Sequence, residues 1–116
     1  MESQHAPQPE LCLSFGEHLK KSCEKHWSSL QWRVKPPNDL FLANKKVAGI
    51  LLETVTQGSQ HRLLFGLGFN VLDYPIDPAF EATSLKNHLA TTPSQTQWNF
   101  FLDSLFTNIR GDLGLS

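Results

Sequence analysis

Apolar positions follow different patterns along the chain, and each pattern predicts a different kind of element. In residues 10–26 the apolar side chains recur at steps of three and four while charged side chains fall elsewhere, which predicts an amphipathic helix. The apolar stripe of this helix consists of Leu11, Phe15, Leu19, Cys23 and His26. Residues 1–9 hold two prolines and two glutamines without apolar periodicity, so we expect a disordered leader there.

Four segments in the middle of the chain are typical of β-strands: residues 30–34, 40–42, 46–55 and 62–71. The first alternates between apolar and polar positions, and the last two are long runs rich in aliphatic side chains. Turn-forming residues separate the segments at 35–39, 43–45 and 57–60. Because short turns join consecutive strands, an antiparallel meander is the most economical arrangement.

The C-terminal part of the chain returns to helical patterns. Residues 72–80 hold two prolines and two aspartates and predict a surface loop, and residues 83–88 predict a short helix. Ser94 and Gln97 form a capping box for a longer helix, which we expect to end at Gly111. Its wide apolar face consists of Trp98, Phe101, Leu102, Leu105, Phe106 and Ile109. The predicted fold class is therefore α+β, an antiparallel β-meander flanked by helices.

Size and composition limit the class of protein. A chain of 116 residues with 40% hydrophobic positions supports one core, so we expect one domain over 10–110 and a C-terminal tail over 111–116. Ten basic and eleven acidic residues give a net charge of −1, which argues against a nucleic-acid partner. There is no apolar run of about 18 residues and no signal-like N-terminus, so we expect no membrane partner and a cytoplasmic location.

Two kinds of catalytic or metal site find little support in the sequence. Cys23 and His26 are three residues apart, with Cys12 and His18 nearby, but all four lie on one predicted helix, whereas structural zinc needs ligands that converge from paired turns. The two cysteines are better explained as free thiols in the core. Nucleophilic catalysis has no support, because there is no Gly-x-Ser-x-Gly elbow and neither cysteine lies in an electropositive turn.

A nucleotide site is the stronger candidate. It would be assembled from Lys35, Asn38, Asp39, Lys46, Gly49, Gly66, Gly68 and Asn70. Asp39 and Lys46 are one hairpin apart, so a carboxylate able to hold Mg²⁺ and an ammonium able to neutralise phosphate could meet at one end of the meander. Gly66 and Gly68 share one face of their strand, and without Cβ atoms they allow a flat ligand to approach the backbone.

Three segments, in this order and spacing, resemble the second half of the catalytic domain of biotin protein ligases. They are KPPNDL at 35–40, KKVAGILLE at 45–53 and GLGFNV at 66–71, and the resemblance spans about residues 11–109. It implies an enzyme that activates biotin with ATP to biotinyl-5′-adenylate and transfers the biotin to a lysine of a carboxylase carrier domain. The substrates implied are ATP and biotin, with Mg²⁺.

The resemblance also implies a role for each matching residue. Asp39 would lie at the Mg²⁺ and phosphate side, Asn38 would shape that turn, and Lys46 would be the catalytic residue that contacts the biotin carboxylate and the phosphate. The other positions divide into a secondary phosphate contact, Lys35; the lining of the biotin cleft, Gly49 and Ile50; and the floor of the adenylate pocket, Gly66, Gly68 and Asn70.

The sequence departs from the family pattern in two respects. Pro36 stands where the family usually has tryptophan, and nothing in the chain matches the Gly/Arg-rich loop of the family's first half or the C-terminal barrel of some members. We therefore expect this chain alone to form biotinyl-adenylate very slowly or not at all. Its expected partners are a biotin carboxyl carrier domain and a complementary N-terminal ligase half or a second copy.

Two alternatives remain open. The first is a non-catalytic remnant or interaction module of the same fold. The second is a lipoate–protein ligase, which shares the architecture, although residues 48–51 and 68–71 look more like the biotin branch.

Overall fold

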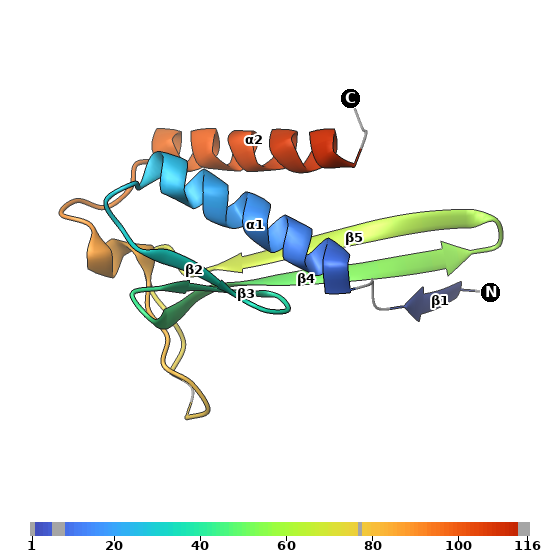
Figure 1. The fold of residues 1–116 in the computed structure, drawn as a ribbon, viewed down its shortest axis with the longest axis horizontal. Coiled ribbons are helices and arrows are strands. Elements are labelled where there is room, and N and C mark those ends of the chain that lie inside the picture. Colours follow the sequence, from blue (N-terminus) through green and yellow to red (C-terminus); the bar gives the residue numbers. More distant parts are fainter. Residues whose placement is uncertain (1, 6–8, 77, 114–116) are drawn as a thin grey trace.

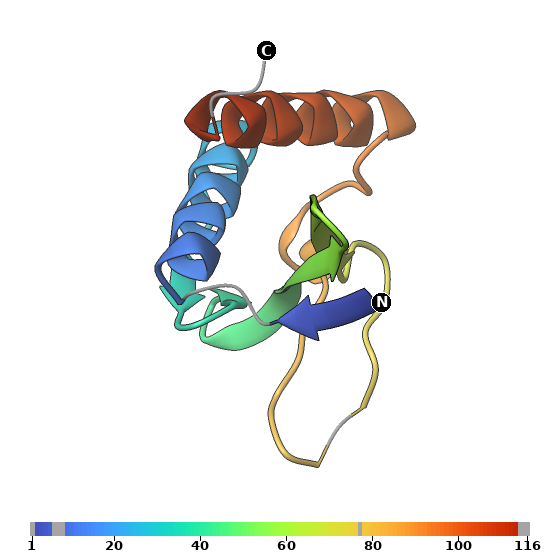
Figure 2. The ribbon, with the colours of Figure 1, turned by 90° about the vertical axis from the view of Figure 1, so that its right-hand side faces the viewer.

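Two helices lie on one face of a five-stranded antiparallel sheet, which confirms the α+β prediction (Figure 1). The computed structural model describes residues 2–5, 9–76 and 78–113. The helical elements are α1 (Pro9–His26), the short 3₁₀ helix η1 (Leu85–His88) and α2 (Gln95–Asp112). Figure 2 shows both long helices on the same side of the sheet, with the loop that precedes η1 extending from the opposite side.

The longest strand is the centre of the sheet. The strands are β1 (Glu2–His5), β2 (Trp32–Lys35), β3 (Asp39–Leu42), β4 (Lys45–Gln57) and β5 (Gln60–Phe69). β5 pairs with residues 48–57 of β4 along one edge of that strand. β3 pairs with the first part of β4 and β1 with residues 54–57, so both must share the other edge, and β2 extends the sheet beyond β3.

The predicted turns between strands are present. Ala43 and Asn44 have φ values of 51° and 66°, as expected for a two-residue hairpin loop whose backbone twist matches that of the strands. Gly58 has φ 61° in the β4–β5 turn, a conformation that glycine adopts without steric cost.

The core lies between the sheet and the helices. The buried side chains of α1 are Phe15, Leu19, Cys23 and the small Ser22, and those of α2 are Phe101, Leu105 and Ile109, so most of the two predicted apolar stripes is confirmed. Cys23 is a core thiol as predicted, its burial raises its pKa, and both cysteines are free. Phe101 stacks on Trp98 with ring centroids 5.0 Å apart and also contacts Phe69 at 5.7 Å. Gly16 brings α1 close to β2, because a Cβ there would lie only 3.3 Å from Val34 Cγ1.

Two expectations at the ends of the chain do not hold. Residues 2–5 were expected in a disordered leader but form β1, because residues 54–57 of β4 extend past β3 and offer backbone groups that any sequence can pair with. Residues 1 and 6–8 lie outside the described part of the chain.

The second correction concerns the end of α2. The helix continues through Gly111 to Asp112, and the Leu113 N–H still donates to Ile109 O at 3.1 Å. A glycine weakens a helix by only about 1 kcal/mol and need not end it. Residues 114–116 of the expected tail lie outside the described residues.

The β4–β5 hairpin extends beyond the helices (Figure 1). The radius of gyration is accordingly 15.3 Å, larger than the value of about 13 Å typical of a compact domain of this length. Among the described helices none is long and apolar enough to cross a membrane.

Candidate functional site

The outer face of the sheet, away from the helices, carries a floor of glycines. Gly49 faces Gly68 across β4 and β5, and Leu51 faces Gly66. A Cβ added at Gly68 would have no atom within 4 Å, so the backbone there is open to a ligand. The prediction that Gly66 and Gly68 share one face is confirmed.

A cation and a carboxylate meet beside this floor, as the sequence predicted. Lys46 Nζ lies 3.2 Å from Asp39 Oδ1, and the two side chains are 28% and 29% exposed. Gly49 lies beneath the pair, since a Cβ there would be 3.7 Å from both atoms. The pair is therefore half-screened from solvent yet reachable from the glycine floor.

A segment that the sequence analysis did not assign to the site holds Lys46 in place. The Lys46 N–H donates to Glu81 O at 3.0 Å, and the Thr83 N–H donates to Lys46 O at 2.9 Å, so residues 81–83 run parallel to the start of β4. The Phe80 ring lies 4.9 Å from Lys46 Nζ. In the sequence, the only signal for this contact is that Phe80 is an aromatic residue at the end of a loop with two prolines.

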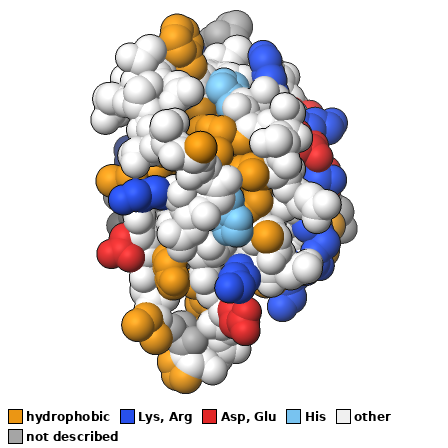
Figure 3. Space-filling model, turned by 90° about the vertical axis from the view of Figure 1, so that its left-hand side faces the viewer, with side chains coloured by type: hydrophobic (Ala, Val, Ile, Leu, Met, Phe, Trp, Pro, Cys, Tyr) orange, Lys and Arg blue, Asp and Glu red, His pale blue; other side chains and the backbone are white. Residues whose placement is uncertain are grey.

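The loop before this segment presents apolar side chains to solvent. Ile76 is 96% exposed and Leu72 59% exposed, and Tyr74 and Phe80 are partly exposed. Figure 3 shows hydrophobic side chains gathered at the bottom of the molecule, where this loop lies. The prediction of a surface loop over 72–80 is confirmed for its described residues.

Two asparagines form hydrogen bonds that connect the segments around the site. Asn38 O accepts a hydrogen bond from the Ile50 N–H at 2.8 Å, and Asn38 Nδ2 donates to Ile50 O at 3.0 Å, which fits the role of shaping the turn before Asp39. Asn70 donates from its N–H to Val47 O at 2.8 Å and from Nδ2 to Thr83 O at 3.2 Å. Asn70 therefore joins β4 to the segment that holds Lys46.

Two adjoining clefts lie over the floor. One, of about 260 Å³, is lined by Lys46, Ala48, Gly49, Gly68, Asn70, Pro75, Phe80 and Ala82. The other, of about 490 Å³, is lined by Asn38, Asp39, Lys46, Gly49, Ile50, Leu51, Gly66, Leu67 and Gly68. Eight of the nine predicted site residues thus line one continuous depression, although the buried Ile50 side chain points to the core and only its backbone contributes.

Lys35 is the predicted residue that the structure does not bring to the clefts. It lines neither of them, and its Nζ lies 5.2 Å from the centre of the Phe41 ring. β3 separates β2 from β4, so Lys35 lies one strand farther from the glycine floor than Asp39, with which it pairs in register.

The donor set suits a metal ion that is shared with a substrate better than a resident one. No group of three or more His, Cys, Asp or Glu side chains gathers anywhere in 9–76 and 78–113. Mg²⁺ is commonly bound by one or two carboxylates together with substrate phosphates. Asp39, a single accessible carboxylate beside an open cleft, fits that mode.

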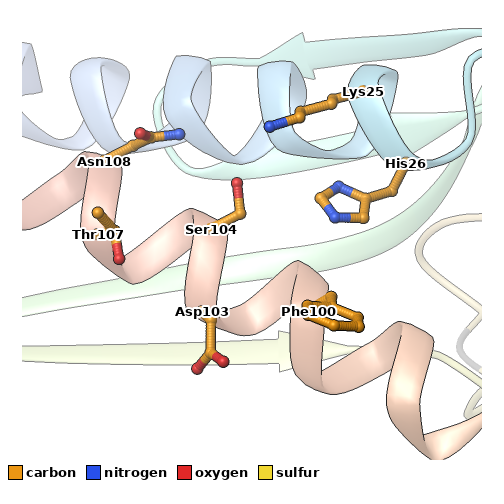
Figure 4. A pocket seen from close by; sticks show the side chains of 7 residues that line it. All are labelled: Lys25, His26, Phe100, Asp103, Ser104, Thr107 and Asn108. Atoms are coloured by element: carbon orange, nitrogen blue, oxygen red, sulfur yellow. The ribbon is translucent and has the colours of Figure 1, made fainter.

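A second depression lies between the helices, on the other side of the molecule (Figure 4). It has a volume of about 600 Å³ and is lined by Lys25, His26, Phe100, Asp103, Ser104, Thr107 and Asn108. It contains none of the predicted site residues, so the outer face of the sheet remains the candidate site.

Comparisons with known proteins agree with this architecture. The model of the biotin/lipoate A/B protein ligase family matches residues 4–70. A mutant of the biotin protein ligase from Aquifex aeolicus in complex with biotin has a TM-score of 0.68 at 22% identity, covering 97% of this chain and 48% of that one. The same organism's enzyme in complex with biotin and ATP has a TM-score of 0.64 at 21% identity, covering 94% and 49%.

A structure solved in complex with lipoate also shares the fold. P. falciparum LipL1 in complex with lipoate has a TM-score of 0.60 at 12% identity, covering 96% of this chain and 34% of that one. No curated protein matches the sequence. The chain spans about half the length of the Aquifex structures it matches.

Proposed function

Since the chain belongs to the biotin/lipoate A/B protein ligase family, we propose that the outer face of its sheet binds biotin and ATP for biotin–protein ligation. In that reaction a carboxylate oxygen of biotin attacks the α-phosphorus of ATP, pyrophosphate leaves, and a lysine amine of a carrier domain then displaces AMP from biotinyl-adenylate. The observation that carries the proposal is the convergence of Asp39, Lys46 and the three glycines on one open depression.

Lys46 is the proposed catalytic residue. Its ammonium is held between the Asp39 carboxylate and the Phe80 ring, and its backbone is fixed by residues 81–83. A positive charge positioned before the reaction stabilises the negative charge that develops on the phosphate as the carboxylate attacks. Lys46 would contact the biotin carboxylate and the phosphate together and so align the two reacting groups.

The glycine floor and the residues around the turn at Asn38 would bind the biotin, the adenylate and the metal ion. Gly49 and the backbone of Ile50 would line the biotin side, and Gly66 and Gly68 would lie under the adenylate, where open backbone accepts a flat group. Asp39 would share an Mg²⁺ ion brought by ATP, and that ion would supply further positive charge to the phosphates.

The proposed site has little positive charge of its own. Lys46 is the only Lys or Arg that lines either cleft within the described residues, whereas the triphosphate of ATP carries several negative charges. We therefore propose that rapid adenylation needs basic groups from a complementary ligase half or a second chain. The isolated chain should release pyrophosphate from ATP and biotin very slowly, and robust release would contradict this part of the proposal.

Two neighbouring lysines provide a matched test of the site. Lys46→Gln should weaken the binding of biotinyl-adenylate, measured by calorimetry, by about tenfold or more, because a charge-assisted contact contributes about 1.5–3 kcal/mol. Lys45, one residue away, is exposed and lines neither cleft. Lys45→Gln removes the same charge and should leave the affinity for biotinyl-adenylate within about twofold of the unaltered chain. Equal effects of the two substitutions would count against the site.

Calorimetric titration also distinguishes a biotin ligase from a lipoate ligase and from a non-catalytic module. Lipoyl-adenylate in place of biotinyl-adenylate tests the lipoate alternative, which the structural likeness to LipL1 in complex with lipoate supports. Tighter binding of the lipoyl compound would assign the chain to that branch. If neither adenylate binds, with or without an N-terminal ligase half, the chain is a non-catalytic module of this fold.

A further inference from the structure

The outer face of the sheet carries a second cluster of charge beside the proposed site. Across β2, β3 and β4 the pairing register forms two rows, Arg33–Phe41–Lys46 and Lys35–Asp39–Gly49. Asp39 is the only acidic residue in these rows, and it pairs with Lys46. Two cations, Arg33 and Lys35, are therefore left over.

Both surplus cations are held against one aromatic ring. Arg33 Cζ lies 5.1 Å and Lys35 Nζ 5.2 Å from the centre of the Phe41 ring, and both side chains are exposed. Among the described residues neither makes an ion pair. We call Arg33, Phe41 and Lys35 the β2–β3 platform.

The platform lies beside the clefts and outside them. Neither Arg33 nor Lys35 lines a cleft, whereas Asp39 on β3 and Lys46 on β4 both line the cleft of about 490 Å³. β2 lies next to β3, so the platform adjoins the Asp39 side of the depression. A protein whose lysine reaches the depression from this side would therefore also lie over the platform.

We propose that the β2–β3 platform docks an acidic surface of the protein substrate, the carrier domain whose lysine receives biotin. The proposal rests on the proposed function, which requires a protein lysine to reach an adenylate over the glycine floor. Exposed cations attract an acidic surface, and an aromatic ring that restricts their motion lowers the entropy lost when they bind it. The platform lies next to the site in the register, so one flank of an entering carrier domain would contact it.

The test measures carrier binding directly and does not need a turnover. The probe is an apo biotin carboxyl carrier domain, titrated against the whole chain by fluorescence anisotropy at low and at moderate salt. Arg33→Gln with Lys35→Gln should weaken binding about three- to tenfold and should reduce its salt dependence. Phe41→Leu keeps both charges and should weaken binding about twofold.

A control double variant removes the same charges elsewhere. Arg62→Gln with Lys86→Gln also replaces one arginine and one lysine, both exposed and away from β2 and β3, and should change carrier affinity by less than about twofold. Equal losses in the two double variants, an unchanged affinity in the platform variant, or no carrier binding by the unaltered chain would each overturn the proposal. A platform variant that loses affinity for biotinyl-adenylate and keeps its affinity for the carrier would assign the two cations to the phosphate and overturn the proposal.

The outcomes separate the docking surface from the proposed function. If the adenylate binds in a Lys46-dependent way and the carrier does not bind, only the platform is wrong. If the carrier binds through the platform and no adenylate binds, the ligase proposal fails and the interaction surface remains.

Discussion

The two faces of the β4–β5 hairpin are built from neighbouring residues of the same strands but have opposite properties. Ala48, Ile50 and Leu52 point under the helices and are buried, and opposite them Phe65, Leu67 and Phe69 pack against the same core. The alternate positions form the glycine floor and, farther along, leave Leu51 and Leu64 58% and 46% exposed. Because side chains alternate along a strand, one face can stabilise the fold while the other stays open for a ligand.

The covered face should be the one that determines stability. Phe101→Ala removes a fully buried ring that contacts Trp27, Phe69 and Trp98, and it should lower the free energy of unfolding by about 3–5 kcal/mol in urea denaturation. Phe100→Ala, one residue away and 65% exposed, should cost less than about 1 kcal/mol. Similar losses of unfolding free energy in the two variants would mean that the helices do not bury this face of the sheet.

The open face should affect binding without affecting stability. Gly68→Val places a side chain where no atom lies within 4 Å, so the free energy of unfolding should change by less than about 1 kcal/mol. The same side chain fills the depression and should weaken biotinyl-adenylate binding by about tenfold or more.

A glycine outside the site controls for the substitution itself. Gly111→Ala also adds a Cβ in open space, in an exposed part of α2, and it should stabilise the helix by about 0.5–1 kcal/mol without changing binding. Unchanged binding in Gly68→Val would show that the glycine floor is not where the ligand lies.

The smallest effect is expected at the polar contact between the helices. The hydrogen bond from Ser14 Oγ (2.9 Å), followed by the contact with His18 (3.4 Å), lowers the pKa of Asp112 from its usual 3.8. Because the pKa is lower in the folded state, the contact stabilises the protein above pH 3.8, and this contribution is lost as the pH falls below that value. Asp112→Asn should therefore lower the melting temperature slightly near neutral pH, and the difference from the unaltered chain should shrink in acid.

Asp103→Asn is the matched control, because it removes an exposed carboxylate from the same helix. It should show no such pH-dependent difference. A large effect of Asp112→Asn would mean that the helical layer depends on this contact more than on its apolar core.

Local signals in the sequence predicted most elements well. The capping box at Ser94 and Gln97 is present with both hydrogen bonds, at 2.9 and 3.1 Å, because its two partners are three residues apart. The turn at Ala43 and Asn44 is equally local. What the sequence analysis missed depends on distant partners: the pairing of residues 2–5 with β4 and the bonds from residues 81–83 to Lys46.

The candidate site shows the same division. Eight predicted residues gather around one depression because strand register aligns them. They lie on β4, on β5 and the residue that follows it, or at the first residue of β3 and the one before it. Lys35 shares a motif with Asn38 and Asp39, but it pairs in register with Asp39 from the far strand and rests on Phe41. Proximity in sequence therefore did not predict proximity to the cleft.

The α+β class, the two apolar helix stripes and the family could be predicted from the amino-acid sequence, since periodicity, turn residues and motif spacing are all local properties of the chain. The three-dimensional fold was needed to show which face of the sheet stays open, that Lys46 is held between Asp39 and Phe80, and that Arg33 and Lys35 form a separate basic surface. Those features depend on sheet register and on which face the helices cover, and both are set by contacts between residues far apart in the chain.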